Sequence, residues 1–179
     1  MLEINNTTGE KINAPKLRAI AEKFARVYKS TGDKESTRDK GSNKKTRNIS
    51  LAIVGPARIK SHNLKYRGLN KATDVLSFKK EKEIIINISE TKKPERYWGM
   101  LAELGMDIKT AIGATGKITA ETGATGTAQK KRLSEYLLYF LFVHGLLHLA
   151  GYDDKTEPGR REMIKKGRDF LKKIGLRYP

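Results

Sequence analysis

Two histidines four residues apart are the clearest chemical feature of this sequence. His144 and His148 lie in "HGLLHLAGYDD", residues 144–154, in a chain with three histidines and no cysteine. Residues four apart on an α-helix share one face, so both imidazoles could bind the same metal ion. Without cysteine, the other ligands must be oxygens or nitrogens, a donor set that suits zinc. The alternative is a pair of histidines packed in an apolar core.

A metal at this pair needs a third ligand, and the residues after the helix supply candidates. Gly151 is a typical helix stop, and Asp153, Asp154 and Glu157 follow it closely. A carboxylate would leave one metal position open for water, as in catalytic zinc sites. Asp154 could instead only open the next segment. A zinc peptidase is disfavoured, because Gly145 stands where the His-Glu-x-x-His motif has its general base.

The charge of the chain favours a polyanionic partner. Thirty-seven Lys and Arg residues against 20 Asp and Glu give a net charge of +17 over 179 residues. Such a balance favours nucleic acid or the ribosome, ahead of an anionic membrane surface, although an inert basic surface is the alternative. The length predicts one domain, residues 1–179. The N-terminus shows no secretory signal, and the apolar run Tyr136–Ala150 is too short to span a membrane, so a cytoplasmic location is expected.

The pattern of apolar residues predicts an α+β fold in which a small mixed sheet of about four strands is packed with helices. The histidines lie on a helix expected near its centre. Strands are predicted in "LEIN", "ISLAIV", "TDVLSF" and "EIIINIS". Helices are predicted from Asn13 as cap, from Pro56 to about Tyr66, from about Arg132 to Ala150, and from about Pro158 to Ile174.

Two segments do not fit this pattern. Residues 30–48 are polar and charged and predict a mobile loop, which could contact RNA. Residues 91–130 predict a low-complexity insertion in which Gly-Ala-Thr-Gly occurs twice, with one helical turn near "RYWGMLAEL". The "GATGK" it contains is not a phosphate-binding P-loop, because Ala111 replaces the first glycine and Ile118 replaces the final Ser or Thr.

Two blocks of the sequence resemble the YbeY family of single-strand endoribonucleases, the rRNA maturation factors. "HGLLHLAGYDD" is similar to the family signature His-Gly-x-Leu-His-Leu-x-Gly-Tyr-Asp-His. "NLKYRGLNKATDVLSF", Asn63 to Phe78, is similar to the family's Asn-x-x-Tyr-Arg-Gly followed by Thr-Asp-Val-Leu-Ser-Phe. Both blocks occur in the family's order, and the resemblance covers most of the chain outside the loop and the insertion.

The resemblance implies a site with one zinc ion. Its first two ligands fall on His144 and His148, and its third falls on Asp154, where the family has histidine. Because aspartate is shorter and anionic, we expect a working metal centre with altered metal preference or a higher pH optimum. The catalytic residues implied are His144, His148 and Arg67, whose planar guanidinium can donate two parallel hydrogen bonds to a phosphodiester.

Other polar residues are assigned less directly. The general base is left open between Asp153, Glu157 and, if it is not a ligand, Asp154. Asp74 is expected to be structural. His62 stands where the family usually has an apolar residue, and we expect it to be exposed or packed rather than part of the site.

The function implied is a zinc-dependent endoribonuclease of the cytoplasm that acts on single-stranded rRNA. Its tasks would be 16S rRNA 3′ end maturation and ribosome quality control. The expected partners are rRNA and ribosomal particles, with a ribosomal protein or a GTPase as further candidates, and neither a membrane nor DNA. The rival interpretation is an RNA-binding factor in ribosome assembly with weak or no catalysis, which the missing third histidine suggests.

Overall fold

The sheet at the centre of the molecule has four strands and is mixed. In the computed structural model, which describes residues 1–32, 48–97, 99, 102 and 123–177, the strand order is β1-β2-β4-β3. The strands are β1 (Leu2–Asn6), β2 (Ile49–Val54), β3 (Val75–Phe78) and β4 (Glu83–Asn87). β1, β2 and β4 run parallel, and β3 pairs with β4 in the antiparallel sense at one edge. The predicted α+β class with a small mixed sheet is therefore confirmed.

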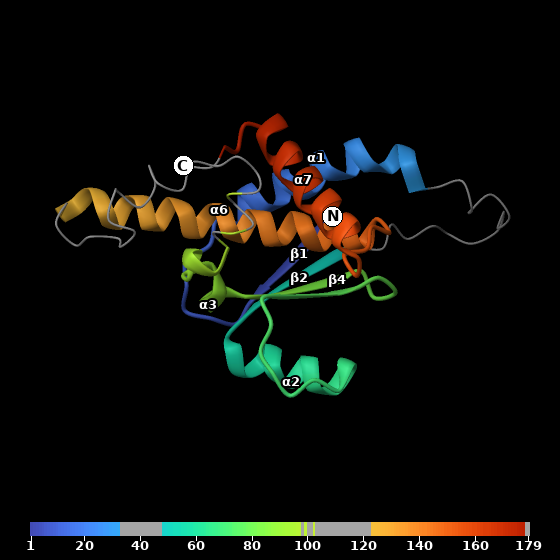
Figure 1. The fold of residues 1–179 in the computed structure, drawn as a ribbon, viewed down its shortest axis with the longest axis horizontal. Helices are drawn as coiled ribbons and strands as arrows, with labels where there is room; N and C mark the ends of the chain where they lie inside the picture. The colour runs from blue at the N-terminus through green and yellow to red at the C-terminus, as the bar shows by residue number, and fades with distance from the viewer. Residues whose placement is uncertain (33–47, 98, 100–101, 103–122, 178–179) are drawn as a thin grey trace, which may run out of the picture.

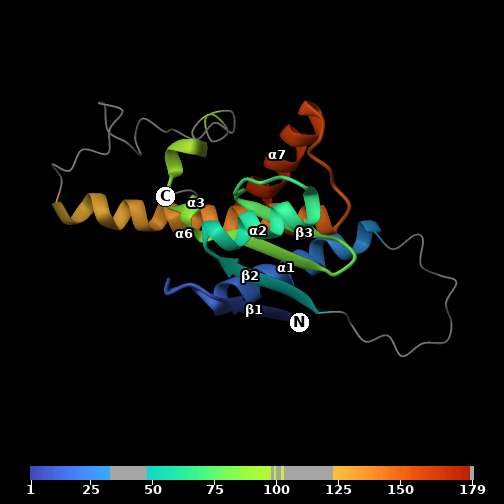
Figure 2. The ribbon, with the colours of Figure 1, turned by 90° about the horizontal axis from the view of Figure 1, so that it is seen from below.

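Helices cover both faces of this sheet (Figures 1 and 2). They are α1 (Ala14–Gly32), α2 (Pro56–Arg67), α3 (Ile88–Thr91), α6 (Gly123–Leu149) and α7 (Glu157–Lys173), with a 3-10 turn, η1 (Pro94–Tyr97). α2 lies on one face, whereas α6 lies on the other face against β3 and β4. α1 and α7 pack on α6, which places the histidine-bearing helix in the middle of the molecule, as predicted.

The alternation of buried side chains along β4 explains these layers. Ile84 and Ile86 join the large core beneath α6, and Ile85 joins a smaller core beneath α2. All three are essentially inaccessible to solvent. A strand that is buried on both faces is apolar without interruption, and "III" in β4 follows this rule. α6 is likewise apolar on all sides between Tyr136 and Val143, as expected for a helix enclosed by a sheet and two helices.

Four predicted boundaries were wrong. β3 begins at Val75 rather than at Thr73. α6 begins at Gly123 rather than near Arg132. The prediction missed its first turns because they lack apolar periodicity, although their Ala, Gln and Lys residues favour a helix. β4 ends at Asn87 rather than at Ser89, because the Asn87 side chain accepts a hydrogen bond from the Ser89 N–H (3.2 Å) and caps α3. α1 continues to Gly32, into the predicted charged loop.

Much of the two unusual segments lies outside the described residues. This holds for 33–47 of the charged loop and for 103–122 of the predicted insertion, including "GATGK". The helical turn predicted near "RYWGMLAEL" overlaps η1 at its first residues, Arg96 and Tyr97. Among the helices that the structure describes, none is both long and apolar enough to cross a membrane.

Candidate metal centre and its cleft

The end of α6 turns the chain back past the two histidines. Gly151 adopts a φ of +101°, a region that favours glycine, and its N–H donates to the His148 carbonyl (3.0 Å). The Tyr152 N–H donates to the Leu147 carbonyl (3.1 Å), which completes a Schellman motif. The predicted helix stop at Gly151 is confirmed, and the reversal carries Asp154 back to the last turns of α6.

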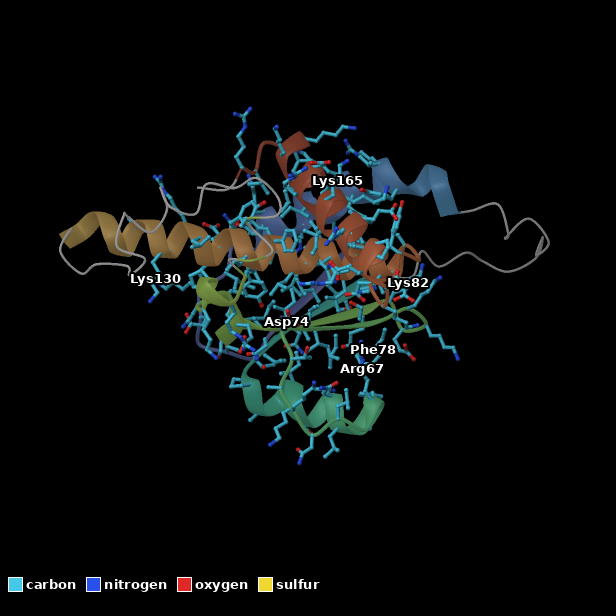
Figure 3. All side chains as sticks on the ribbon, in the orientation of Figure 1. Arg67, Asp74, Phe78, Lys82, Lys130 and Lys165 are labelled. Atoms are coloured by element: carbon cyan, nitrogen blue, oxygen red, sulfur yellow. The ribbon has the colours of Figure 1, made fainter. Side chains whose placement is uncertain are left out.

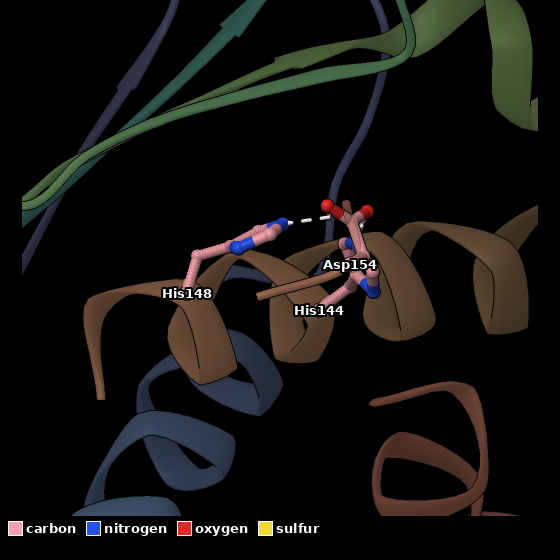
Figure 4. Close-up of side chains that lie close together, drawn as sticks. All are labelled: His144, His148 and Asp154. Carbon is pink, nitrogen blue, oxygen red and sulfur yellow. Dashed lines mark hydrogen bonds and ion pairs between the residues drawn. The ribbon is translucent and has the colours of Figure 1, made fainter. Parts of the chain in front are cut away.

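This reversal brings together three potential metal ligands (Figure 4). Asp154 Oδ2 lies 3.2 Å from His144 Nε2 and 3.7 Å from His148 Nε2. The two imidazole rings are perpendicular, with centroids 4.8 Å apart. One donor atom from each of the three residues lies within 4.8 Å of the other two. The structure thus groups His144, His148 and Asp154 as a set that could hold one ion.

The orientation of His148 is fixed by the same turn. Its Nδ1 lies 3.1 Å from the Tyr152 carbonyl oxygen. A carbonyl can only accept, so Nδ1 carries the proton and Nε2 presents its lone pair toward Asp154. Metal-binding histidines usually have such an acceptor behind the ring, because it selects the tautomer and holds the ring in place.

The separations within the cluster suit a tetrahedral ion. Zinc binds imidazole nitrogen and carboxylate oxygen at about 2.0–2.2 Å, which places neighbouring ligand atoms roughly 3.3–3.6 Å apart. The Asp154 oxygen lies at 3.2 and 3.7 Å from the two histidine nitrogens, close to that range. Three protein ligands leave a fourth position open. Two nitrogens and one oxygen fit zinc, and they also fit other divalent transition metals.

The protonation of the cluster favours metal binding near neutral pH. A hydrogen bond with His144 is the main cause that lowers the pKa of Asp154 to about 2, and the adjacent imidazoles add to it. Burial is the main cause that lowers the pKa of His148, and repulsion from His144 adds to it. Asp154 is therefore a carboxylate and His148 a neutral imidazole near neutral pH, which are the forms that ligate metals.

The cluster lies in a cleft of about 1150 Å³ between the end of α2, β3, and the turn after α6. Six cationic residues line it: Arg67, Lys71, Lys79, Arg96, Lys155 and Arg160. The last three pair with Glu90, Asp153 and Glu157 respectively. Within the described part of the chain, Arg67, Lys71 and Lys79 form no ion pair. The free positive charge of the cleft is therefore concentrated on one wall, which runs from the end of α2 through the following loop to the residue after β3.

Local hydrogen bonds position this cationic wall. Arg67 is the last residue of α2, which ends at Gly68 in the left-handed conformation (φ +70°). Buried Asn63 donates from Nδ2 to the Lys71 carbonyl (2.8 Å) and so ties the following loop to the helix. Arg67, at the end of α2, and Phe78, on β3, are marked in Figure 3. Arg67 lines the same cleft as the ligand cluster, although it is far from the cluster in sequence.

The candidate general bases differ in their surroundings. Asp153 lines the cleft, but it pairs with the Lys155 ammonium (3.1 Å), and hydrogen bonding to Lys155 lowers its pKa. Glu157 accepts from Arg161 (3.0 Å) and is not among the residues lining the cleft. Asp74 accepts from the Val75 N–H (2.8 Å) and the Tyr97 hydroxyl (3.3 Å), which fits the structural role expected for it.

Other residues of the cleft escaped the sequence analysis. Glu90 is buried, lines the cleft, and pairs with Lys93 (3.1 Å) and Arg96. Its one signal in the sequence is its place directly after "EIIINIS", the segment predicted as a strand. Lys79 follows β3, and a Cβ atom placed on Gly151 would be 3.6 Å from its Nζ. His62 is half-buried on α2, stacks on Tyr66, and does not line the cleft.

Known proteins resemble this chain over most of its length. The family model described as Endoribonuclease YbeY matches residues 3–175. The Endoribonuclease YbeY of Ligilactobacillus salivarius is 31% identical over 136 residues, which cover 72% of this chain and 76% of that protein. That of Geobacillus kaustophilus is 34% identical over 130 residues, which cover 72% of this chain and 73% of that protein. The solution structure of TM1509 from Thermotoga maritima aligns over 97% of this chain and 89% of that chain, at 19% identity and a TM-score of 0.43. On the family model and the two relatives, the chain belongs to the endoribonuclease YbeY family.

Proposed function

We propose that this protein is a metal-dependent endoribonuclease that hydrolyses phosphodiester bonds in single-stranded RNA. One observation carries the proposal: the cluster of His144, His148 and Asp154 shares a cleft with Arg67, Lys71 and Lys79, which form no ion pair with any other described residue. A metal site alone could serve structure, and a cationic wall alone could bind any polyanion. Their combination is what the hydrolysis of a phosphodiester requires.

Each residue of the cleft has a role in this proposal. His144, His148 and Asp154 hold the ion, which would activate water and polarise the phosphate. The Tyr152 carbonyl keeps His148 in its binding orientation. Arg67 donates to the phosphate oxygens and stabilises the negative charge that develops as water adds to phosphorus and the bond to the leaving oxygen breaks.

The cationic wall would hold the rest of the strand. Lys71 and Lys79 lie in the same cleft as Arg67 and can bind neighbouring phosphates, releasing counterions as they do so. Each such contact with single-stranded RNA makes the slope of log affinity against log salt concentration more negative by about 0.7. The net charge of +17 favours this encounter with RNA over long range.

The finer parts of the proposal concern the ion and the substrate. The ion is zinc, which the two nitrogens and one oxygen of the cluster suit. The substrate is rRNA in ribosomal particles of the cytoplasm, with the 3′ end of 16S rRNA as the segment matured, and a ribosomal protein or a GTPase as a further partner. The relatives named Endoribonuclease YbeY support the reaction class.

Metal analysis combined with an RNA cleavage assay tests the proposal. We expect one zinc per chain, cleavage of a single-stranded oligoribonucleotide that a chelator abolishes, and little cleavage of the same strand in a duplex. His144→Ala should abolish both metal binding and cleavage. Cleavage that persists without metal, or that is unchanged in the His144→Ala variant, would contradict the proposal.

A second function is favoured by the aspartate at position 154. An anionic third ligand lowers the charge of the site, and a centre weakened in this way would leave an RNA-binding factor for ribosome assembly. The variant Asp154→His separates the two functions. If it raises zinc occupancy and cleavage from near zero, the binding factor is favoured. If the unchanged protein already cleaves RNA and His144→Ala abolishes that activity, the enzyme is favoured.

A further inference from the structure

An exposed aromatic ring stands beside the proposed phosphate-binding arginine. Tyr66 directly precedes Arg67 at the end of α2, and 54% of its surface is accessible to solvent. Large apolar side chains that remain exposed are unremarkable when they are scattered singly. Tyr66 is different because its neighbours are aromatic and cationic and because Arg67, the next residue, lines the catalytic cleft.

Two other rings support the Tyr66 ring. Phe78 of β3 meets it edge-on, with centroids 5.0 Å apart and planes inclined at 62°. His62, one turn earlier on α2, lies within 6° of parallel, with centroids 6.0 Å apart. Phe78 in turn packs against the core beneath α2. The neighbouring rings therefore hold the exposed Tyr66 ring in place, so less side-chain entropy is lost when a ligand covers it.

The charged residues that flank Tyr66 in the sequence are cationic. The Lys65 ammonium lies 5.1 Å from the centroid of the Tyr66 ring. No Asp or Glu occurs between Pro56 and Thr73, a stretch that also contains Arg67 and Lys71. A planar ring flanked by cations complements a nucleotide, whose base stacks on the ring and whose phosphate attracts the cations.

We propose that Tyr66, supported by His62 and Phe78, is a stacking site for one unpaired base of the RNA strand whose phosphate Arg67 binds. This inference rests on the proposed function, since it needs an RNA strand in the cleft. Every base presents a π-face, so the site accepts any of the four bases. It rejects a base inside a duplex, whose faces are covered by its neighbours, and thus selects single-stranded RNA.

Binding measured without cleavage tests this site. The probe is a short, fluorescently labelled adenosine oligoribonucleotide, titrated with the full-length protein in the presence of a chelator. A matched probe has the same ribose-phosphate chain without bases. Tyr66→Ala should weaken binding of the adenosine strand by roughly five- to a hundredfold, the cost of losing one base stack. It should leave the affinity for the abasic strand unchanged.

Three matched variants make the result specific. Tyr66→Phe keeps the ring and should bind like the unchanged protein. His62→Ala removes one support and should weaken binding less than Tyr66→Ala. Leu64→Ala removes another exposed side chain of α2 (49% accessible) and should have no effect. Equal loss on the abasic strand, or no loss on the adenosine strand, would overturn the stacking site.

Kinetics separate the failure of this inference from that of the proposed function. In the metal-loaded protein, Tyr66→Ala should raise KM with kcat unchanged, because a base stacked away from the reacting bond is bound equally in the ground and transition states. A protein that binds the adenosine strand through Tyr66 but never cleaves it supports the stacking site and contradicts the endoribonuclease. A protein that cleaves RNA equally well with and without the Tyr66 ring supports the endoribonuclease and contradicts the stacking site.

Discussion

Gly145 of α6 lies directly against Ile84 of β4. A Cβ atom placed on Gly145 would be 2.8 Å from Ile84 Cγ2, which is too close for any side chain without movement. His144 and His148 line the cleft, whereas Gly145 faces the sheet. The glycine that takes the place of the zinc-peptidase glutamate is thus a packing residue. It lets the helix that carries both histidines approach the sheet closely.

Gly145→Ala should therefore destabilise the protein. The added methyl group overpacks a fully buried contact at a cost of about 1–3 kcal/mol, which outweighs the gain of about 0.5–1 kcal/mol from replacing glycine within a helix. The melting temperature should fall by several degrees in thermal unfolding. In an Ile84→Ala background, where the contact is absent, the same substitution should not destabilise. An equal loss of stability in both backgrounds would show that the contact with Ile84 is not its cause.

Removal of the Asp154 carboxylate should weaken metal binding strongly. Asp154→Ala leaves two ligands, and we expect zinc affinity to fall by more than the roughly 10–100-fold that loss of an outer-shell partner costs. Asp153→Ala is the matched control, since this neighbouring carboxylate pairs with Lys155 instead. Competition with a chromophoric chelator measures both affinities. Equal losses in the two variants would point to charge near the site rather than to a ligand.

The parts of the site that depend on local sequence could be predicted, and those that depend on long-range contacts could not. The spacing of His144 and His148 and the glycine stop after them are properties of one helix end. Arg67 was found through the family resemblance, because no local pattern links it to residues so far along the chain. Buried Glu90 was missed, since its pairing with Arg96 and its position in the cleft arise only when η1 folds against α6. The same holds for the contact between Gly145 and Ile84.

The turn at Gly151 should be necessary for the geometry of the metal centre. Gly151→Ala places a Cβ at φ +101°, which costs about 1–2 kcal/mol or relaxes the turn. Relaxation would move the Tyr152 carbonyl away from His148 Nδ1, so zinc affinity should fall together with stability. Gly175→Ala, at φ +85° after α7, is the control that should lose stability alone. Thermal unfolding and zinc titration of both variants check this difference.

Tyr97 should make the stability of the protein sensitive to alkaline pH. Burial, with the Asp74 carboxylate adding to it, raises the pKa of Tyr97 well above its ordinary value of 10.0. The folded protein then keeps a proton that the unfolded chain releases above about pH 10, so this contribution is complete below that pH and is lost as the pH rises further. Tyr97→Phe should flatten the decline. Denaturant unfolding at several alkaline pH values measures both slopes, and equal slopes would contradict the assignment.

Arg67 should be required for catalysis but not for metal binding. Arg67→Lys keeps the charge but loses the planar fork that can bind two phosphate oxygens at once, so the substitution is not conservative at such a site. We expect kcat to fall on the order of a hundredfold, as when one donor to a transition-state oxyanion is removed. Zinc affinity should be unchanged, because Arg67 is not part of the ligand cluster.

Lys60→Ala, an exposed cation of α2 that does not line the cleft, is the control and should keep kcat within about twofold. If Arg67→Lys cleaves as fast as the unchanged protein, the guanidinium does not stabilise the transition state, and charge alone would account for its place in the cleft.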